Sequence, residues 1–426
     1  MRPILSAVAL GAITLFAASA QAAEATAPAA EPSMFTFSGF GTIGLVKTNT
    51  DDAVYNTGSQ DGGATTKASF GPDTKLGLQL GAKFNDTFSA TGQLLSQLNA
   101  VGTWTPEVEW AFAKAKLGAG FSVRAGRIGA PFFMVSDYRS VGYTNLSVRT
   151  PPDVYAQVPI SHFDGGDVLY QGNFGDATVN AQVFGGKTSK LIGTDVTFNL
   201  TNMFGVNASV EYGPVTFRVG SVKTKLGAEG SGLDGFNTLL GGLYAMGQVP
   251  SLESLTTLAD DIAIQGKSAS FSGVGMALDW NNIVASAEYT WRRSESLYVS
   301  DTTGWYATAG YRIGKWTPYA SLSRRIMDGP ISVTGPAVSP TLPPIVQGTV
   351  PVLIGAVNSG IINNSAQKTT ALGVRWDAGK SFDIKAEWAR LAVPAGSVGG
   401  FSDVQGGRFA VDTNVNVFTI AVDFVF

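Results

Sequence analysis

Residues 268–293 read SASFSGVGMALDWNNIVASAEYTWRR, two alternating runs joined by the dipeptide Asn281-Asn282. In the second run the odd positions from Ile283 to Trp291 are apolar or small, whereas the even positions include Glu288 and Arg292. A period of two predicts a β-strand with one apolar and one polar face, and Asn-Asn favours a tight turn. Hairpins of this kind are typical of membrane β-barrels, whose strands of about ten residues face lipid on one side and the lumen on the other.

The same alternation recurs along the chain and predicts sixteen strands. They lie at 35–46, 74–84, 87–97, 107–117, 121–129, 165–173, 176–185, 203–212, 215–223, 268–279, 283–293, 303–313, 316–326, 367–378, 381–391 and 413–426. Tight turns alternate with longer connections, which is the anatomy of an outer-membrane barrel. The predicted fold class is therefore all-β, a transmembrane antiparallel β-barrel of sixteen strands.

The composition agrees with a barrel and excludes other classes. The 426 residues include 52 glycines and no cysteine, 14% are charged, and the mean hydropathy is +0.14. Soluble proteins carry roughly 25% charged residues. The absence of cysteine excludes disulfide scaffolds and cysteine zinc sites, and a net charge of −3 argues against a basic nucleic-acid binder. A water-soluble all-β fold is the alternative, but it would not segregate short and long connections so regularly.

The N-terminus reads as an export signal. Met1-Arg2 precedes an uncharged apolar run, and Ala20-Gln21-Ala22 is a small-residue cleavage pattern. We therefore expect a signal peptide at 1–22, with an N-terminal membrane anchor as the alternative. An Ala- and Pro-rich disordered lead-in at 23–33 and one barrel domain at 34–426 follow. A bacterial signal with a barrel implies the Gram-negative outer membrane.

Tryptophans mark both ends of the predicted strands. Trp280, Trp316 and Trp376 adjoin short turns, and Trp110, Trp291, Trp305 and Trp388 lie at the opposite ends. Two aromatic girdles are expected at the two membrane interfaces. One strand disobeys the alternation, because Lys114 and Lys116 share the parity of Trp110 and Phe112. A β-bulge, or lysines that extend to the periplasmic rim, would explain the exception.

Three long connections have unusual compositions. Segment 130–164 contains four prolines and many aromatic residues, and we expect it to be an ordered loop that either narrows the pore or caps it externally. Residues 329–367 carry no charge, and their prolines argue against a spanning helix, so we expect an apolar surface loop on the barrel mouth or a neighbouring subunit. Within 224–267, the stretch from Pro250 to Leu258 predicts one short helix.

The region after the fifth strand carries a family resemblance. Its residues are Arg124-Ala-Gly-Arg127, Pro131-Phe-Phe, Ser136-Asp-Tyr138, Val141-Gly-Tyr143, Arg149-Thr-Pro-Pro152, Val154-Tyr155 and Phe163-Asp-Gly165. The chain resembles the Gram-negative general porins, in particular a less characterised porin-like branch. The resemblance implies a homotrimer, a third loop folded into the lumen at 130–164, and a terminal Phe426 read by the barrel-assembly machinery. The acidic PEFGG-type loop tip of many porins is absent.

Charged residues on inward parity or on the third loop are the candidate pore residues. They are Arg124, Arg127, Asp137, Arg139, Arg149, Asp153, His162, Asp164, Arg218, Glu288, Arg292, Arg312, Arg375 and Lys385. Lys75, Lys83 and Arg325 also have inward parity. Clusters of charged side chains select ions in pores, so we expect loop acids to face wall cations across a narrow zone. The alternative is that some of the arginines merely pin the loop.

The predicted function is passive diffusion of small hydrophilic solutes and ions through a water-filled outer-membrane channel. A substrate-specific channel with a saturable site and an adhesin-like barrel are the alternatives. No enzymatic activity is expected, because the single histidine, His162, lies beside Ser161 and Asp164 without a nucleophile-elbow motif. We expect no cofactor, no metal and no nucleic-acid partner. The expected partners are outer-membrane lipid and lipopolysaccharide, further copies of the chain, and the assembly machinery.

Overall fold

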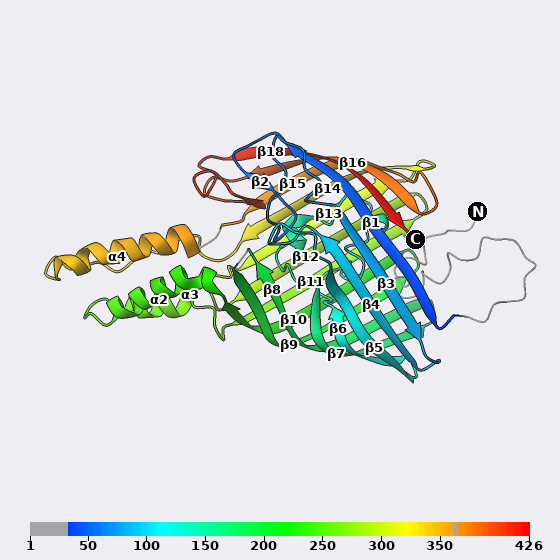
Figure 1. The fold of residues 1–426 in the computed structure, drawn as a ribbon, viewed down its shortest axis with the longest axis horizontal. Coiled ribbons are helices and arrows are strands. Elements are labelled where there is room, and N and C mark those ends of the chain that lie inside the picture. Colours follow the sequence, from blue (N-terminus) through cyan, green and yellow to red (C-terminus); the bar gives the residue numbers. More distant parts are fainter. Residues whose placement is uncertain (1–32, 194, 362–363) are drawn as a thin grey trace, which may run out of the picture.

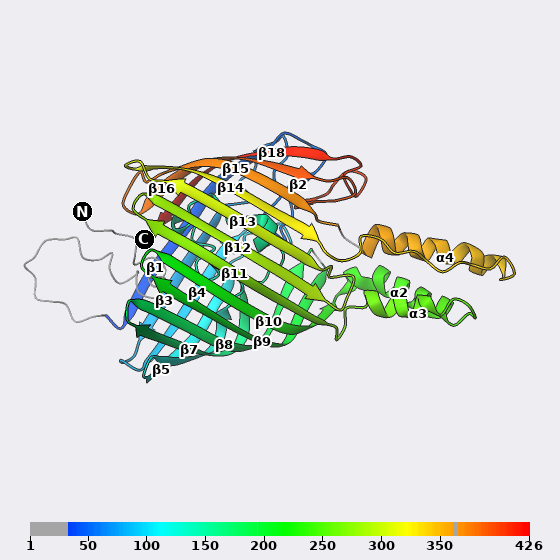
Figure 2. The same ribbon diagram turned by 180° about the vertical axis from the view of Figure 1, so that it is seen from behind.

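The computed structural model describes residues 33–193, 195–361 and 364–426. The predicted signal peptide and all of the predicted lead-in except Ser33 lie outside these residues. The described chain is a closed barrel with a helical projection at the long-loop end, as Figures 1 and 2 show.

Sixteen strands of the described chain close the barrel, which confirms the predicted fold class. β1 (Phe35–Thr48) pairs with β18 (Thr413–Val425) on one side and with β3 (Lys75–Lys83) on the other, and every neighbouring pair is antiparallel. The remaining strands are β4 (Phe88–Gln97), β5 (Glu107–Gly118), β6 (Phe121–Gly129), β7 (His162–Phe174), β8 (Ala177–Ile192), β9 (Val196–Tyr212), β10 (Val215–Glu229), β11 (Ser268–Trp280), β12 (Ile283–Ser294), β13 (Thr302–Tyr311), β14 (Trp316–Met327), β15 (Gln367–Trp376) and β16 (Phe382–Val393).

Strands β8, β9 and β10 extend further toward the long-loop side than the alternation predicts. Most of the connection expected at 186–202 is paired β-structure that continues β8 and β9. The added residues include Lys187, Thr197 and Asn199, whose polar side chains break the apolar pattern. Register shifts also interrupt the parity here, one of them between Gly186 and Thr188. A strand that continues beyond the apolar part of the membrane no longer alternates apolar and polar residues, so the sequence pattern does not reveal it.

The two faces of the wall alternate as predicted. On β12, Tyr289 is 48% exposed on the outer face, whereas its neighbour Glu288 is 4% exposed and points inward. The barrel closes where outward aromatic rings cover glycines of β1. The Phe426 ring lies over Gly39 and the Phe424 ring lies over Gly41, so any side chain at either glycine would collide with a ring. The seam between the first and last strands is therefore packed as well as hydrogen bonded.

The exception on β5 is explained by inward aromatic residues. Phe112 faces the lumen, where the Arg124 guanidinium lies 5.2 Å from its ring centroid. Trp110 has the same orientation and buries its indole Nε1, so its predicted place in the outer girdle is wrong. The register shifts opposite Gln93, next to this tryptophan. Lys114 and Lys116 therefore share a lumen face, because the rings beside them pack on structure inside the barrel.

Loops fill part of the long-loop mouth. β2 (Val54–Tyr55) pairs with β17 (Phe401–Ser402), and these two short strands pack an apolar cluster against the inner faces of β15, β16 and β18. Neither strand was predicted. They join the first and last long loops inside the mouth.

Three helices project beyond the mouth, namely α2 (Asp234–Gly247), α3 (Ser254–Ile262) and α4 (Pro344–Ala356). Short helical turns occur at η2 (Gly142–Thr144), α1 (Pro152–Tyr155), η3 (Ser231–Leu233) and η4 (Val357–Ile361). The helix expected after Pro250 is confirmed as α3. The expectation of a loop over 329–367 is wrong at residues 344–356, where α4 forms and packs against α2. Among the described residues, no helix is long and apolar enough to cross a membrane.

Candidate functional site: the loop inside the barrel

The loop between β6 and β7, residues 130–161, lies inside the barrel. Its apolar residues pack on rings that point inward from the wall, for example Phe133, whose ring centroid is 5.0 Å from that of Phe271 on β11. Phe133 also stacks on Tyr155 of the same loop at 4.4 Å. These contacts place the loop across the lumen rather than over the mouth as an external cap.

Two charged wall residues hold the start of the loop. Arg218 of β10 donates to the carbonyl oxygens of Pro131 and Phe132. The Glu288 carboxylate of β12 accepts the backbone N–H of Met134 at 2.9 Å. Hydrogen bonds to a charged partner are the stronger kind, so this end of the loop is firmly fixed to two strands.

The tip of the loop reaches the short-turn end of the barrel. Lys385 Nζ on β16 donates to the Gly142 carbonyl at 2.8 Å and lies 2.9 Å from Asp423 Oδ2. Arg375 of β15 donates to the carbonyls of Tyr143 and Asn145 at 2.7 and 3.0 Å. Gly142 is required here, because an added Cβ would collide with Asp423.

The returning half of the loop is fixed by ion pairs and buried hydrogen bonds. Arg149 makes a two-pronged contact with Asp73, with N–O distances of 2.8 and 2.6 Å. Asp153 has no exposed surface and accepts from Ser323 on β14 and Gln367 on β15, each at 2.7 Å. Burial raises the pKa of the Asp153 carboxyl, whereas Arg325 and these donors lower it.

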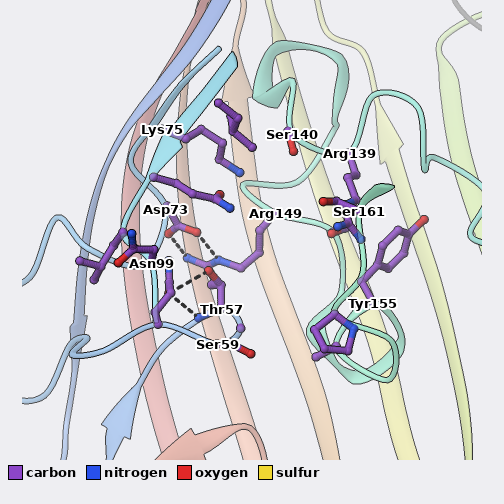
Figure 3. Close-up of a pocket in the computed structure, with 18 of the residues that line it drawn as sticks. Thr57, Ser59, Asp73, Lys75, Asn99, Arg139, Ser140, Arg149, Tyr155 and Ser161 are labelled. Carbon is purple, nitrogen blue, oxygen red and sulfur yellow. Dashed lines mark hydrogen bonds and ion pairs between the residues drawn. The ribbon is translucent and has the colours of Figure 1, made fainter. Parts of the chain in front are cut away.

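A cavity of about 170 Å³ separates the loop from strands β3, β4 and β5. Figure 3 shows Lys75 on the strand side and Arg139 on the loop across from it. Among the described residues, neither side chain forms an ion pair within 4.0 Å. The other charged lining residues are partnered: Arg149 with Asp73, Lys190 with Glu107 at 3.6 Å, and Glu109 with His162 at 3.5 Å.

The comparisons with known proteins decide the family. The model of the Gram-negative porin family matches residues 7–326. The chain belongs to the Gram-negative porins. A comparison with curated protein sequences gave no match.

The solved structures to which this porin is similar share its fold. OmpF of Salmonella typhi in complex with daunomycin has 13% identity and a TM-score of 0.53, over 92% of this chain and 97% of that chain. The outer-membrane channel DcaP of Acinetobacter baumannii has 11% identity and a TM-score of 0.52, over 92% and 97%. An anion-selective porin from Comamonas acidovorans has 12% identity and a TM-score of 0.50, over 92% and 99%. At such low identities, the likeness concerns the fold alone.

Family and fold together make this porin an outer-membrane channel for passive diffusion. Its walls are a transmembrane β-barrel in the Gram-negative outer membrane. The resemblance noted in the sequence is thereby confirmed.

The porin uses half of the predicted pore residues as loop anchors. Arg149, Asp153, Arg218, Glu288, Arg375 and Lys385 hold the loop as described, and Arg292 donates to the Gln157 carbonyl at 2.6 Å. Arg124 pairs with Asp167 on the wall at 2.5 Å, and Arg312 pairs with Asp279 at the short-turn end at 2.7 Å. Asp137 is exposed on the loop. The loop contacts fit the alternative expectation, in which arginines hold the loop in place, better than arginines that face loop acids across an open pore.

Arg127 and Asp164 are placed on the outer face, which corrects their assignment to the lumen. The two side chains pair with each other at 2.8 Å, and they are 34% and 45% exposed. Their neighbours Ile128 and Phe163 point inward and are fully buried. Arg124 and Arg127 are three residues apart, so a regular strand puts them on opposite faces. This three-residue spacing was the signal in the sequence that the two arginines face opposite sides of the wall.

Glu107, Glu109 and Lys190 line the cavity but were missing from the sequence prediction. Glu109 adjoins a register shift in β5, which hides its inward orientation from an alternation count. Lys190 lies in the unpredicted extension of β8. Both irregularities are properties of strand pairing, which the sequence of one strand does not reveal.

Proposed function

We propose that this porin passes small hydrophilic solutes and ions through the cavity between loop 130–161 and strands β3 to β5, with a preference for anions. The observation that carries the proposal is the pair of unpaired cations, Lys75 and Arg139, on opposite sides of that cavity. Each carboxylate on the lining has a cationic or histidine partner, so the remaining field is positive. Charged side chains in a narrow zone set ion preference.

The test is the reversal potential of the purified porin in a planar bilayer with a potassium chloride gradient. Wild-type protein is expected to favour chloride, and the double variant Lys75→Glu with Arg139→Glu is expected to change the permeability ratio several-fold toward potassium. Lys83→Glu is the matched control, because Lys83 is exposed and pairs with Asp86 at the short-turn end. Equal reversal potentials for the wild type and the double variant would show that Lys75 and Arg139 do not set the ion preference.

We further propose that the barrel has no catalytic activity. The hydroxyl of Ser161 and the carboxylate of Glu109 both approach the same ring nitrogen of His162, Nδ1, at 3.2 and 3.5 Å. A serine triad needs the serine on one ring nitrogen and the acid on the other. The other nearby acid, Asp164, pairs with Arg127 at 2.8 Å. This arrangement supports a barrel without a serine triad.

The proposed assembly is a homotrimer in outer-membrane lipid and lipopolysaccharide, and residues 1–22 are proposed to be a removed signal peptide. The outer surface supports membrane contact, since it carries large exposed apolar side chains such as Phe217, Ile420 and Phe426. Light scattering after mild detergent extraction is expected to give the mass of three chains. A monomer mass in several detergents would contradict the trimer.

A further inference from the structure

A second, larger cavity opens on the long-loop side of the channel. Its volume is about 790 Å³, within the range of roughly 300–1,000 Å³ typical of small-molecule sites. It borders the segment 57–60 together with Pro152, Ala156 and Pro159, all of which also border the narrow cavity, so the two adjoin. We call this larger cavity the vestibule. A solute entering from outside meets it before the narrow zone.

The vestibule wall is unusually apolar for a hydrophilic channel. Its inward side chains come mainly from the loop and from strands β8 to β11, and most of them are aliphatic or aromatic. They include Phe132, Leu200, Met203, Val222, Leu226 and Phe271. The acids on the lining, Asp61 and Asp403, are exposed residues of the outer loops. A wall of this kind favours the apolar part of a solute over water.

Two arginines point into this apolar surface, and they differ in their partners. Arg292 is fully occupied, because it donates to the Gln157 carbonyl and twice to the Ser300 carbonyl. Arg325 is 7% exposed, and its Nε and Nη2 atoms are buried without an acceptor among the described residues. Asp153 attracts Arg325 but forms no ion pair with it within 4.0 Å, because the Asp153 oxygens accept from Ser323 and Gln367.

We propose that the vestibule binds a monoanionic solute with an apolar body, such as an aromatic carboxylate, with the carboxylate on Arg325. A guanidinium with unsatisfied N–H donors is the fitting partner of a carboxylate, which accepts two parallel hydrogen bonds. The apolar side chains would take the ring. The inference rests on the proposed channel function and deepens it, since it names the solute class that the channel concentrates at its entrance.

The experiment measures 3-phenylpropionate flux into proteoliposomes that contain the purified porin. Flux is expected to saturate with concentration, and acetate, which lacks the ring, is expected to give linear flux. The uncharged amide, 3-phenylpropionamide, is expected not to compete. Arg325→Gln is expected to raise the half-saturation concentration by at least about tenfold, as the loss of a charged hydrogen-bond partner predicts.

Arg324→Gln is the matched control, because Arg324 is the neighbouring arginine on the exposed outer side of the same strand. Leu200→Asn is a second variant that changes the apolar wall and leaves Arg325 in place, and it is also expected to raise half-saturation for 3-phenylpropionate. Potassium chloride conductance of each variant reports an intact channel.

The outcomes separate the two proposals. Linear 3-phenylpropionate flux through a conducting wild-type channel would overturn the vestibule site and leave the channel function intact. Equal competition by the amide, or equal half-saturation for Arg325→Gln and Arg324→Gln, would overturn the role of Arg325. Absence of any conductance in the wild type would instead contradict the channel function itself.

Discussion

At the residue scale, Lys385 shows how the barrel buries charge. Its side chain has no exposed surface and lies 2.9 Å from Asp423 and 3.8 Å from Asp383. Lys385→Met keeps an unbranched side chain of nearly the same length but removes the positive charge beside the buried Asp423 and Asp383. We expect the free energy of unfolding to fall by about 3–5 kcal/mol, the usual effect of removing one partner from a buried ion pair. Urea unfolding followed by tryptophan fluorescence measures the loss.

Lys368→Met is the control for that measurement. Lys368 is exposed on the outer face of the neighbouring strand β15, and no ion pair with it is found among the described residues. An exposed lysine contributes little to stability, so its unfolding midpoint is expected to stay near that of the wild type. Equal midpoints for the two variants would mean that the buried network is not stabilising.

The sequence predicts which face such residues take but not what they touch. Lys385 and Glu288 have inward parity, and the structure places both inward. On the loop, their partners are backbone groups, the Gly142 carbonyl and the Met134 N–H, and no sequence motif marks such groups. The predicted acid–base field across the lumen assumed side-chain partners on the loop, whereas Arg218, Arg292 and Arg375 hold the loop through backbone carbonyls.

At the element scale, wall arginines hold the loop at its start and at its tip. Arg218 holds its start at β10, and Arg375 holds its tip at β15. The double variant Arg218→Gln with Arg375→Gln removes charged donors from both places. We expect larger and noisier single-channel currents, because a loosened loop leaves the cavity wall intermittently. Bilayer recordings at fixed voltage measure both quantities.

Lys116→Gln serves as the control for the loop, because it changes an exposed cation of β5 that makes no loop contact within the described chain. Its current noise is expected to match the wild type. A quiet, unchanged current in the double variant would show that the aromatic packing around Phe133 holds the loop without the arginines.

Outside the membrane, the sequence pattern missed the helices α2 and α4. The prolines that argued against a spanning helix in 329–367 are accommodated by the short helix α4, with Pro344 in its first turn and Pro351 exposed within it. Proline is tolerated in the first turn, since the N–H it lacks would have no intrahelical partner there. The apolar face of α4 that packs with α2 and α3 depends on two other segments, so no single window of sequence reveals it.

At the scale of the whole molecule, the fold was predictable because a barrel repeats one rule sixteen times in the described chain. Lipid on one side and water or packed loop on the other impose the alternation on every strand. The tight turns add the order of pairing, since antiparallel neighbours are joined directly. Function within the lumen lacks such a repeat. It depends on which strand each loop residue meets, and those contacts connect residues far apart in the sequence.

The barrel closes where the C-terminal strand meets β1. Phe426 packs its ring on Gly39 and exchanges backbone hydrogen bonds with it at 2.9 and 3.0 Å, and its ring centroid is 6.3 Å from that of Phe37. Phe426→Ala removes the ring and keeps both hydrogen bonds. If the terminal ring also serves as the signal for the assembly machinery, the variant is expected to be depleted from outer membranes in cells yet to refold into lipid vesicles with only a modest loss of stability.

Two measurements distinguish the role of Phe426 in packing against β1 from a role in recognition by the assembly machinery. Folded protein is quantified by heat-modifiable migration in gels, once from cells and once from refolding without other proteins. Phe418→Ala, a change to an equally outward ring in the middle of the same strand, controls for the loss of lipid contact. A parallel loss in cells and in vesicles would make Phe426 a packing residue alone, because only the cellular reaction contains a machinery able to read the terminus.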